Sequence, residues 1–245
     1  SILLIGDSFA EGPGVKIDDI FAKIVEKNLN KKVLNFGNSG TEPKSQFIRY
    51  SKNVKDYNFD ELIYFFLPYN DYTSPVTEDL NQNELDNKTQ STKFNLGQLK
   101  YQIVDFLSRF TYSYNFLRSA SYLLNVNADY GFKNLSFFYK DIDNIDYTFN
   151  YLDRIIKLKK VKSYIVIIPT IYDINNFQKN NENYKDLYWY KKISKISSEN
   201  NTVLIDLMDY IDFKKKPFYF HSCDGHWSKL GNLFAASIFL ENYKN

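Results

Sequence analysis

The sequence predicts an α/β fold, a three-layer α/β/α sandwich around a mostly parallel five-stranded sheet. Two observations predict it: short apolar runs of strand length alternate with segments of helical periodicity, and the runs are rich in Val, Ile, Leu, Tyr and Phe. Parallel strands are buried on both faces, so they appear as continuous apolar runs. The 245 residues are enough for one such fold with a large core, and we expect residues 1–245 to form a single domain.

Five apolar runs rich in Val, Ile, Leu, Tyr and Phe are the expected strands. In chain order they are ILLIG from Ile2, KVLNFG from Lys32, LIYFFL from Leu62, SYIVIIPT from Ser163 and TVLIDL from Thr202. Residues 18–30 have apolar side chains at helical spacing, with Asp18 or Asp19 placed to cap the helix start. Residues 227–243 have the apolar content of a last helix that docks on the sheet.

Residues 72–150 do not fit this alternation. A crossover between parallel strands needs one helix, and this segment is about twice as long as such a crossover. We therefore expect an insertion within the domain, and its residues 96–124 combine helical periodicity with many Tyr and Phe. Two interpretations stay open: a helical cap that packs on the domain, and a lid that lines a substrate cleft.

The charge balance and the cysteine content limit the expected partners. Lys and Arg total 31 against 29 Asp and Glu, and there is no long basic stripe, so nucleic acid is not an expected partner. The single cysteine, Cys223, cannot form an internal disulfide. No apolar stretch is long enough to span a membrane. The oligomeric state stays open, and for the compartment we lean to a secreted or cell-envelope location whose signal or anchor would precede Ser1.

Glycines gather where the predicted strands end. Ligands of open α/β sheets bind beyond the carboxyl ends of the strands, where glycine allows sharp turns and close approach of the backbone. Gly6, Gly12 and Gly14 follow the first strand, Gly37 and Gly40 follow the second, and Gly225 and Gly231 flank His226. These positions indicate a site at that edge of the sheet.

Polar residues in the same loops supply the parts of an acyl-transfer site. Transfer through a serine needs a hydroxyl nucleophile, an imidazole that takes its proton, a carboxylate that orients the imidazole, and fixed donors for the developing oxyanion. The candidates are Ser8 after the first strand, Gly40 after the second, Asn70 after the third, and Asp224 with His226 before the last helix.

These motifs resemble the blocks of the SGNH hydrolases, also called the GDSL esterase and lipase family. The blocks occur in the family's order as Gly6-Asp7-Ser8, residues 35–41 with Gly40, Tyr69-Asn70-Asp71, and Asp224-Gly225-His226. The resemblance implies the flavodoxin-like SGNH fold and a catalytic triad of Ser8, His226 and Asp224. It also implies an oxyanion hole formed by Gly40, Asn70 and the amide of Ser8, with no metal and no cofactor.

Two positions depart from the family's pattern. Pro68 stands where the third block usually has glycine, which stiffens the loop and removes a backbone donor. The last block is commonly Asp-x-x-His, but position 223 is Cys, so Asp224 is the carboxylate at hand and Trp227 follows the histidine. The segment Asp-x-His-Trp is similar to SGNH-like proteins that add or remove acetyl groups on envelope polysaccharides.

The function predicted from these observations is a serine esterase that hydrolyses a small acyl ester, an acetyl ester above all, on a carbohydrate. Two alternatives stay open: an O-acetyltransferase that acts on a polysaccharide, and a catalytically silent SGNH-like module that binds a glycan. Ser8 could instead cap the turn after the first strand, and Asp224 could cap the last helix. We interpret His221 and Cys223 as loop residues, and Trp227 as core packing.

Overall fold

The computed structural model describes residues 1–53, 56–71, 137, 142–180, 183–222 and 225–244. The chain divides into two units, one of Ser1–Pro75 with Lys133–Asn245 and one of Val76–Phe132, and every described residue belongs to the first. Most of the predicted insertion at 72–150, with its cap and lid interpretations, therefore lies outside the described residues. The part of that range that is described includes the first residues of a crossover helix, α8 (Ile142–Lys157).

A five-stranded parallel sheet forms the centre of the first unit, as predicted. Its strands are β1 (Ile2–Gly6), β2 (Val33–Gly37), β3 (Glu61–Phe66), β4 (Lys162–Ile167) and β5 (Val203–Asp206), in the order β2-β1-β3-β4-β5. The chain leaves β1 for one edge and then crosses back past β1 to β3. The strand order reverses there, and open α/β sheets bind ligands at the carboxyl edge of this position.

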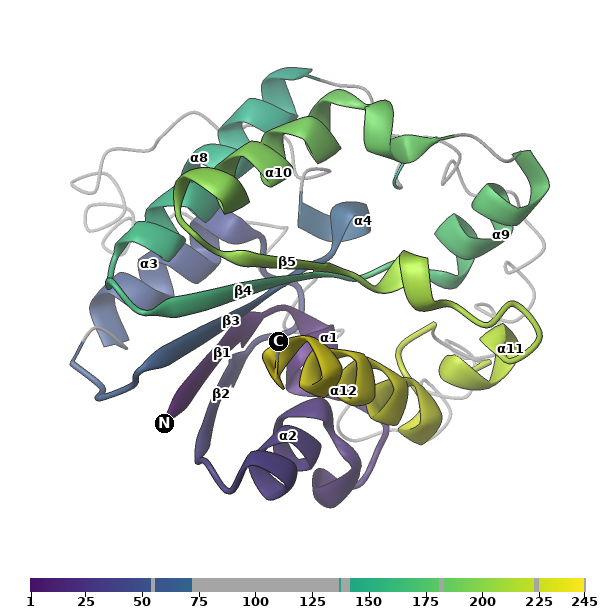
Figure 1. Ribbon diagram of the computed structural model, residues 1–245, viewed down its shortest axis with the longest axis horizontal. Helices are drawn as coiled ribbons and strands as arrows, with labels where there is room; N and C mark the ends of the chain where they lie inside the picture. The colour runs from purple at the N-terminus through teal and green to yellow at the C-terminus, as the bar shows by residue number, and fades with distance from the viewer. Residues whose placement is uncertain (54–55, 72–136, 138–141, 181–182, 223–224, 245) are drawn as a thin grey trace, which may run out of the picture. The chain divides into compact units, whose positions relative to one another are not determined.

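Helices cover both faces of the sheet, which confirms the three-layer sandwich (Figure 1). One face carries α2 (Phe21–Leu29) and α12 (Lys229–Lys244), and the other carries α3 (Pro43–Asn53), α8 and α10 (Tyr188–Glu199). Shorter helices lie in the connections: α1 (Ser8–Glu11), α4 (Pro68–Asp71), α9 (Ile171–Asn180) and α11 (Lys216–Tyr219). Among the described helices, none is long and apolar enough to cross a membrane.

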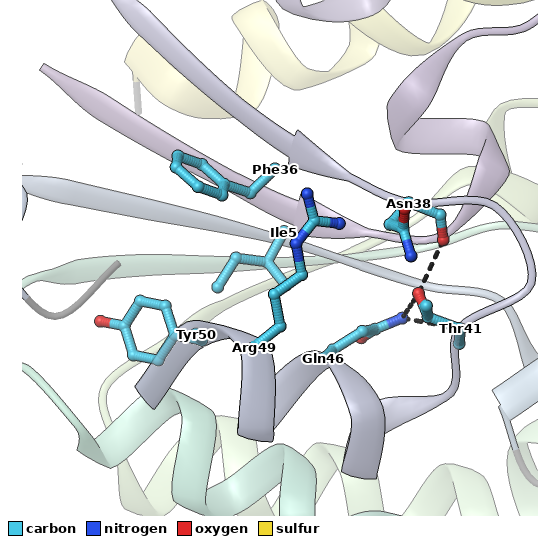
Figure 2. A pocket seen from close by; sticks show the side chains of 7 residues that line it. All are labelled: Ile5, Phe36, Asn38, Thr41, Gln46, Arg49 and Tyr50. Atoms are coloured by element: carbon cyan, nitrogen blue, oxygen red, sulfur yellow. Dashed lines mark hydrogen bonds between the residues drawn. The ribbon is translucent and has the colours of Figure 1, made fainter. Parts of the chain in front are cut away.

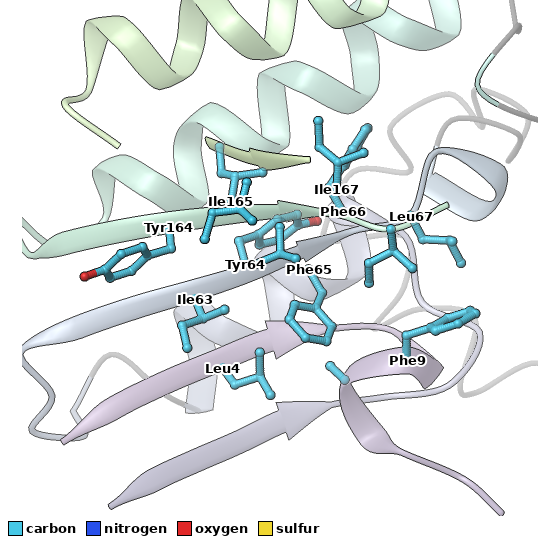
Figure 3. Close-up of a cluster of buried hydrophobic side chains, with 14 of the residues drawn as sticks. Leu4, Phe9, Ile63, Tyr64, Phe65, Phe66, Leu67, Tyr164, Ile165 and Ile167 are labelled. Atoms are coloured by element: carbon cyan, nitrogen blue, oxygen red, sulfur yellow. The ribbon is translucent and has the colours of Figure 1, made fainter. Parts of the chain in front are cut away.

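The central strand β3 joins the two helical layers. All six of its residues are buried, and successive side chains point to opposite faces, as in any strand (Figure 3). The Tyr64 hydroxyl donates a hydrogen bond to Gln46 Oε1 on α3, whereas the Phe65 ring packs edge-on against Phe21 of α2, with ring centroids 4.7 Å apart. Both faces are therefore fixed next to the strand end that leads to Asn70.

The start of α2 differs from the prediction. Asp18 and Asp19 lie in a 3-10 turn (Ile17–Asp19), and Ile20 occupies the N-cap position without a side-chain hydrogen bond. The Phe21 N–H instead donates to Asn232 Oδ1 of α12 at 2.9 Å. A buried asparagine 211 positions away thus satisfies a helix terminus that a local side chain was expected to satisfy.

The last helix begins at Lys229, two residues after the predicted start at 227. Its packing explains Gly231, because a Cβ atom at this position would lie 2.1 Å from the carbonyl oxygen of Tyr219. The backbone of α12 therefore approaches α11 more closely than any side chain would allow. This contact fixes the end of the segment that carries His226.

Candidate active site

Ser8 lies directly beyond the carboxyl end of β1, as the first residue of α1. Asp7 caps this short helix, since its Oδ1 accepts a hydrogen bond from the Phe9 N–H at 3.0 Å. The cap uses the N–H of Phe9, and no acceptor for the N–H of Ser8 is found within the described part of the chain. The side chain of Ser8 is largely buried, with 9% of the residue exposed.

His226 meets Ser8 at this edge of the sheet. Its Nε2 lies 2.9 Å from Ser8 Oγ, across 218 positions of sequence. A short antiparallel bridge between Phe220 and Trp227 holds the histidine loop, and the His221 N–H donates to the carbonyl of His226 at 2.7 Å. The structure therefore brings together the serine and the histidine that the sequence placed at opposite ends of the chain.

Aromatic side chains surround this pair on the core side. The ring of Phe9 lies 5.4 Å from the ring of His226 and packs edge-on against Trp227 at 5.0 Å. Trp227 is 4% exposed and also contacts Phe65 of β3. The tryptophan therefore packs in the core, which is the role that we expected for it, and the imidazole is restrained against an apolar wall.

The other residues of the last block are placed only in part. Asp224 and Cys223 lie outside the described residues, so the role of Asp224 in orienting His226 stays a prediction. His221 lies in the loop and packs against Gly14, where an added Cβ would be 3.0 Å from its Nε2. In the part of the chain that the structure describes, no cluster of three or more His, Cys, Asp or Glu side chains could hold a metal ion.

The predicted oxyanion donors lie in the loops after β2 and β3. Gly40 has a φ of 72°, in the left-handed region that favours glycine, and an added Cβ would meet nothing within 4 Å. Asn70 belongs to α4, and its Nδ2 lies 3.4 Å from Asp7 Oδ2. Asp7 thus links the asparagine of the third block to the residue that precedes Ser8.

Pro68 disturbs the backbone of the third block less than the sequence suggested. It is the first residue of α4, a position where the missing N–H would have no partner within the helix and where the fixed φ suits the first turn. The N–H of Leu67 is satisfied by Asp71 Oδ2 at 2.9 Å. The N–H that proline lacks would therefore make no hydrogen bond within α4, so its absence does not weaken this helix.

The second-block loop, residues 37–41, is fastened to α1. The Glu11 carboxylate accepts hydrogen bonds from both the N–H and the hydroxyl of Ser39. At the start of the loop, a Cβ on Gly37 would lie 2.3 Å from the Glu11 nitrogen, so this glycine is needed for the close approach. The loop that holds Gly40 and the helix that begins with Ser8 are thus one rigid arrangement.

Two buried carboxyl groups lie beside the site. Burial raises the pKa of Asp7 to about 6, against the opposing effects of its hydrogen bonds from Phe9 and Asn70 and of nearby His226. Burial also raises the pKa of Asp71 well above its usual range, and the neighbouring Asp7 raises it further. The sequence contained no sign that both carboxyl groups are buried, because burial depends on the packed sheet.

The sequence itself matches no protein-family model and no curated protein. Solved structures do match it over nearly the whole chain. A GDSL-family lipolytic protein from Veillonella parvula is 14% identical, with a TM-score of 0.55, and the match covers 100% of this chain and 98% of that one. The fold is that of the SGNH hydrolases.

Two further solved structures share the SGNH fold with this chain. A lipase/acylhydrolase from Enterococcus faecalis is 14% identical with a TM-score of 0.57, and the match covers 99% of this chain and 94% of that one. An acetylxylan esterase from Geobacillus stearothermophilus is 14% identical with a TM-score of 0.54, and the match covers 98% of this chain and 92% of that one. The edge where Ser8 and His226 meet is the carboxyl edge of the SGNH sheet.

The raised pKa of Asp7 predicts how stability depends on pH. Between about pH 4 and pH 6, the folded chain binds this proton more tightly than the unfolded chain, so the contribution of Asp7 to the free energy of unfolding falls as the pH rises. The Asp7→Asn variant has no titrating group at this position, so its free energy of unfolding does not have this pH-dependent decrease. We expect the free energy of unfolding of the variant, relative to the unchanged chain, to increase by about 2 kcal/mol from pH 4 to pH 7 in urea denaturation. Parallel pH curves would contradict the buried, proton-holding carboxyl.

Proposed function

We propose that this chain is a serine esterase that hydrolyses a small acyl ester through a covalent acyl-enzyme. The observation that supports this most is the 2.9 Å approach of His226 Nε2 to Ser8 Oγ at the carboxyl edge of the sheet. A serine hydroxyl is a weak nucleophile until an adjacent base takes its proton, and an imidazole can take and return a proton near neutral pH.

The reaction then has two halves. Ser8 Oγ attacks the ester carbonyl carbon while His226 Nε2 takes the hydroxyl proton, and the same nitrogen returns that proton to the leaving alcohol as the C–O bond breaks. In the second half a water molecule gives its proton to His226 and attacks the acyl-enzyme, which releases the acid and restores Ser8. Asp224 would accept a hydrogen bond from Nδ1 of His226 and hold the productive tautomer.

Three donors would stabilise the oxyanion: the N–H of Ser8, the N–H of Gly40 and the side-chain amide of Asn70. The first lies at the start of α1 without an acceptor among the described residues, and Gly40 has open space beside it. Because Asp7 accepts from Asn70 Nδ2, it would fix the amide plane so that a second N–H faces the substrate. Asp7 is then a positioning residue.

The substrate class that we favour is an acetyl ester on a carbohydrate. Among the solved structures with this fold are proteins described as acetylxylan esterases. The Asp-x-His-Trp segment points in the same direction through its similarity to SGNH-like proteins that handle acetyl groups on polysaccharides. Phe9 packs against the imidazole and Trp227 packs edge-on against Phe9, and such an aromatic wall suits a small acyl group better than a long one.

Replacing the proposed nucleophile gives the most direct test. We expect the purified chain to hydrolyse p-nitrophenyl acetate and Ser8→Ala to lower kcat/KM at least about 10³-fold, because the covalent route is lost. Ser45→Ala is the matched control, since Ser45 lies on α3 and its hydroxyl bonds Glu42. A folded wild-type chain without any hydrolysis would favour the silent glycan-binding module. Release of p-nitrophenol that rises with added carbohydrate acceptor would favour transfer to a sugar hydroxyl.

The proposed oxyanion hole predicts a specific kinetic change for Asn70→Ala. Loss of one preorganised donor should lower kcat by about 10²- to 10³-fold and change KM much less, because the donor acts on charge that develops in the transition state. Asn28→Ala is the control, since the amide of Asn28 bonds only its own helix at the carbonyl of Ile24. A change confined to KM would count against an oxyanion role.

Acyl-chain length separates acetyl esters from lipid substrates. We expect kcat/KM to fall about tenfold or more from the acetate to the octanoate ester of p-nitrophenol, because each methylene that a small pocket rejects weakens transition-state binding. Release of acetate from acetylated xylo-oligosaccharides, measured by enzymatic acetate assay, would support a carbohydrate ester. Equal rates for acetate and octanoate would contradict the small-acyl proposal.

A further inference from the structure

We propose that Arg49 forms a second binding site, behind the second-block loop, which takes one oxygen of a carboxylate group. Arg49 lies on α3 and extends toward the end of β2, as Figure 2 shows. The pocket around it has an apolar wall of Ile5, Phe36 and Tyr50 and a polar wall of Asn38, Thr41 and Gln46. We refer to it as the Arg49 pocket.

The guanidinium of Arg49 has no hydrogen-bond acceptor within the described residues. Its Nη1 is buried without a hydrogen-bond acceptor, and no ion pair to it is found in the described part of the chain. An arginine side chain stays charged at all ordinary pH values and carries five N–H donors. Buried charges and buried donors are costly unless something accepts from them, so a group of this kind calls for an acceptor.

Two polar neighbours of Arg49, Gln46 and Thr41, already use their side chains elsewhere. Gln46 is used at both ends, since its Nε2 donates to the Thr41 carbonyl at 3.0 Å and its Oε1 accepts from the Tyr64 hydroxyl. The Thr41 hydroxyl donates to the carbonyl of Asn38 at 2.7 Å. The oxygen of the Asn38 side-chain amide does not accept from Arg49 Nη1 as placed, and the NH2 group of the same amide can add a donor beside the guanidinium.

The carboxylate of Glu11 lies near Arg49 and is hydrogen-bonded to Ser39. Glu11 is close enough to Arg49 for the guanidinium to lower the pKa of Glu11, although its bonds from Ser39 are the larger cause. The Arg49 pocket therefore presents positive charge and N–H donors in partly apolar surroundings, which strengthen a charged hydrogen bond. An anionic oxygen fits this chemistry.

The size of the pocket limits what can enter. It has room for about 10 Å³ of a water-sized group, close to the space that one water molecule needs. A carboxylate can therefore place one oxygen against Nη1 while the rest of its molecule stays outside. Two sources have this chemistry: a free short-chain acid such as acetate, and a carboxylate carried by the ester substrate.

The Arg49 pocket adjoins the proposed oxyanion hole. Asn38 and Thr41 stand on either side of Ser39 and Gly40, so a ligand in the pocket touches the loop that presents the Gly40 N–H. A bound carboxylate would hold this loop by its two ends. This connection to catalysis rests on the proposed esterase function, whereas binding at Arg49 does not.

Thermal unfolding tests binding without reference to activity. The midpoint is measured in sodium acetate and in sodium chloride at equal ionic strength, for the wild type, Arg49→Gln and Arg154→Gln. Arg154 is a matched control because it is exposed and stacks on Phe47 and Tyr151. We expect acetate to raise the wild-type midpoint by about 3 °C at ten times its dissociation constant. Arg154→Gln should keep this rise and Arg49→Gln should lose it, while circular dichroism verifies that both variants are folded.

Kinetics with two matched esters test whether the carboxylate belongs to the ester substrate. The substrates are 4-acetoxybenzoate, which carries a carboxylate, and its neutral methyl ester. If the substrate supplies the anion, Arg49→Gln should raise KM about tenfold for the first ester alone, and Arg49→Lys should restore part of the loss. A positive result in either experiment supports the site and names its source. The proposal is overturned if acetate acts equally on the wild type and Arg49→Gln and the two esters respond alike. If the wild type hydrolyses neither ester, the esterase proposal fails. The thermal unfolding experiment then tests by itself whether the Arg49 pocket binds a carboxylate.

Discussion

Parallel pairing of the five strands is the constraint on which the site depends. When strands run in one direction, their carboxyl ends lie at one edge, and each end can deliver a loop to the same place. β1 pairs with β2 on one side and with β3 on the other, with Gly6 opposite Gly37 and Ile5 opposite Tyr64. Ser8 is therefore flanked by the second-block loop and by α4. The remaining participant, His226, comes from the segment before α12, which the tight contact at Gly231 holds against α11.

Two buried carboxyl groups connect the loops at this edge of the sheet. Asp7 caps α1 with one oxygen and contacts Asn70 with the other, so a single carboxyl group ties the serine loop to the third block. Asp71 lies next to it and bonds the N–H of Leu67. Such groups are unfavourable in a core unless they are hydrogen-bonded. Asp7 and Asp71 therefore hold the loops after β1 and β3 in fixed positions, although burying two carboxyl groups costs folding free energy.

The second-block loop is held from two directions. From α1, Glu11 bonds Ser39, and from α3, Gln46 bonds the carbonyl of Thr41 while the hydroxyl of Tyr64 on β3 bonds Gln46. A glycine in the left-handed region is thereby kept in one conformation despite its freedom. Preorganised donors are worth most when they need not move during the reaction. Arg49 lies on the same side of the loop as Gln46, which is why an anion there would act on the same element.

Features that depend on a local pattern of residues could be predicted from the sequence. Continuous apolar runs located all five strands to within three residues at each end, because strands buried on both faces are continuously apolar. Turn glycines and polar residues after those runs located the candidate loops, and motif order led to the SGNH fold. Two helices were also predicted to within three residues at each end. Residues 18–30 contain α2 and residues 227–243 overlap α12, because both segments have apolar side chains enough for one buried helix face.

Contacts between residues that are distant in sequence could not be predicted and came from the folded chain. It placed Asn232 rather than Asp18 or Asp19 at the start of α2, it set Ser8 against His226, and it left the guanidinium of Arg49 without an acceptor among the described residues. The raised pKa of Asp7 belongs to the same class, since burial causes it. Local sequence sets backbone preference and the order of polar groups, whereas desolvation and pairing arise only when the packed sheet excludes water and brings remote segments within a few ångströms.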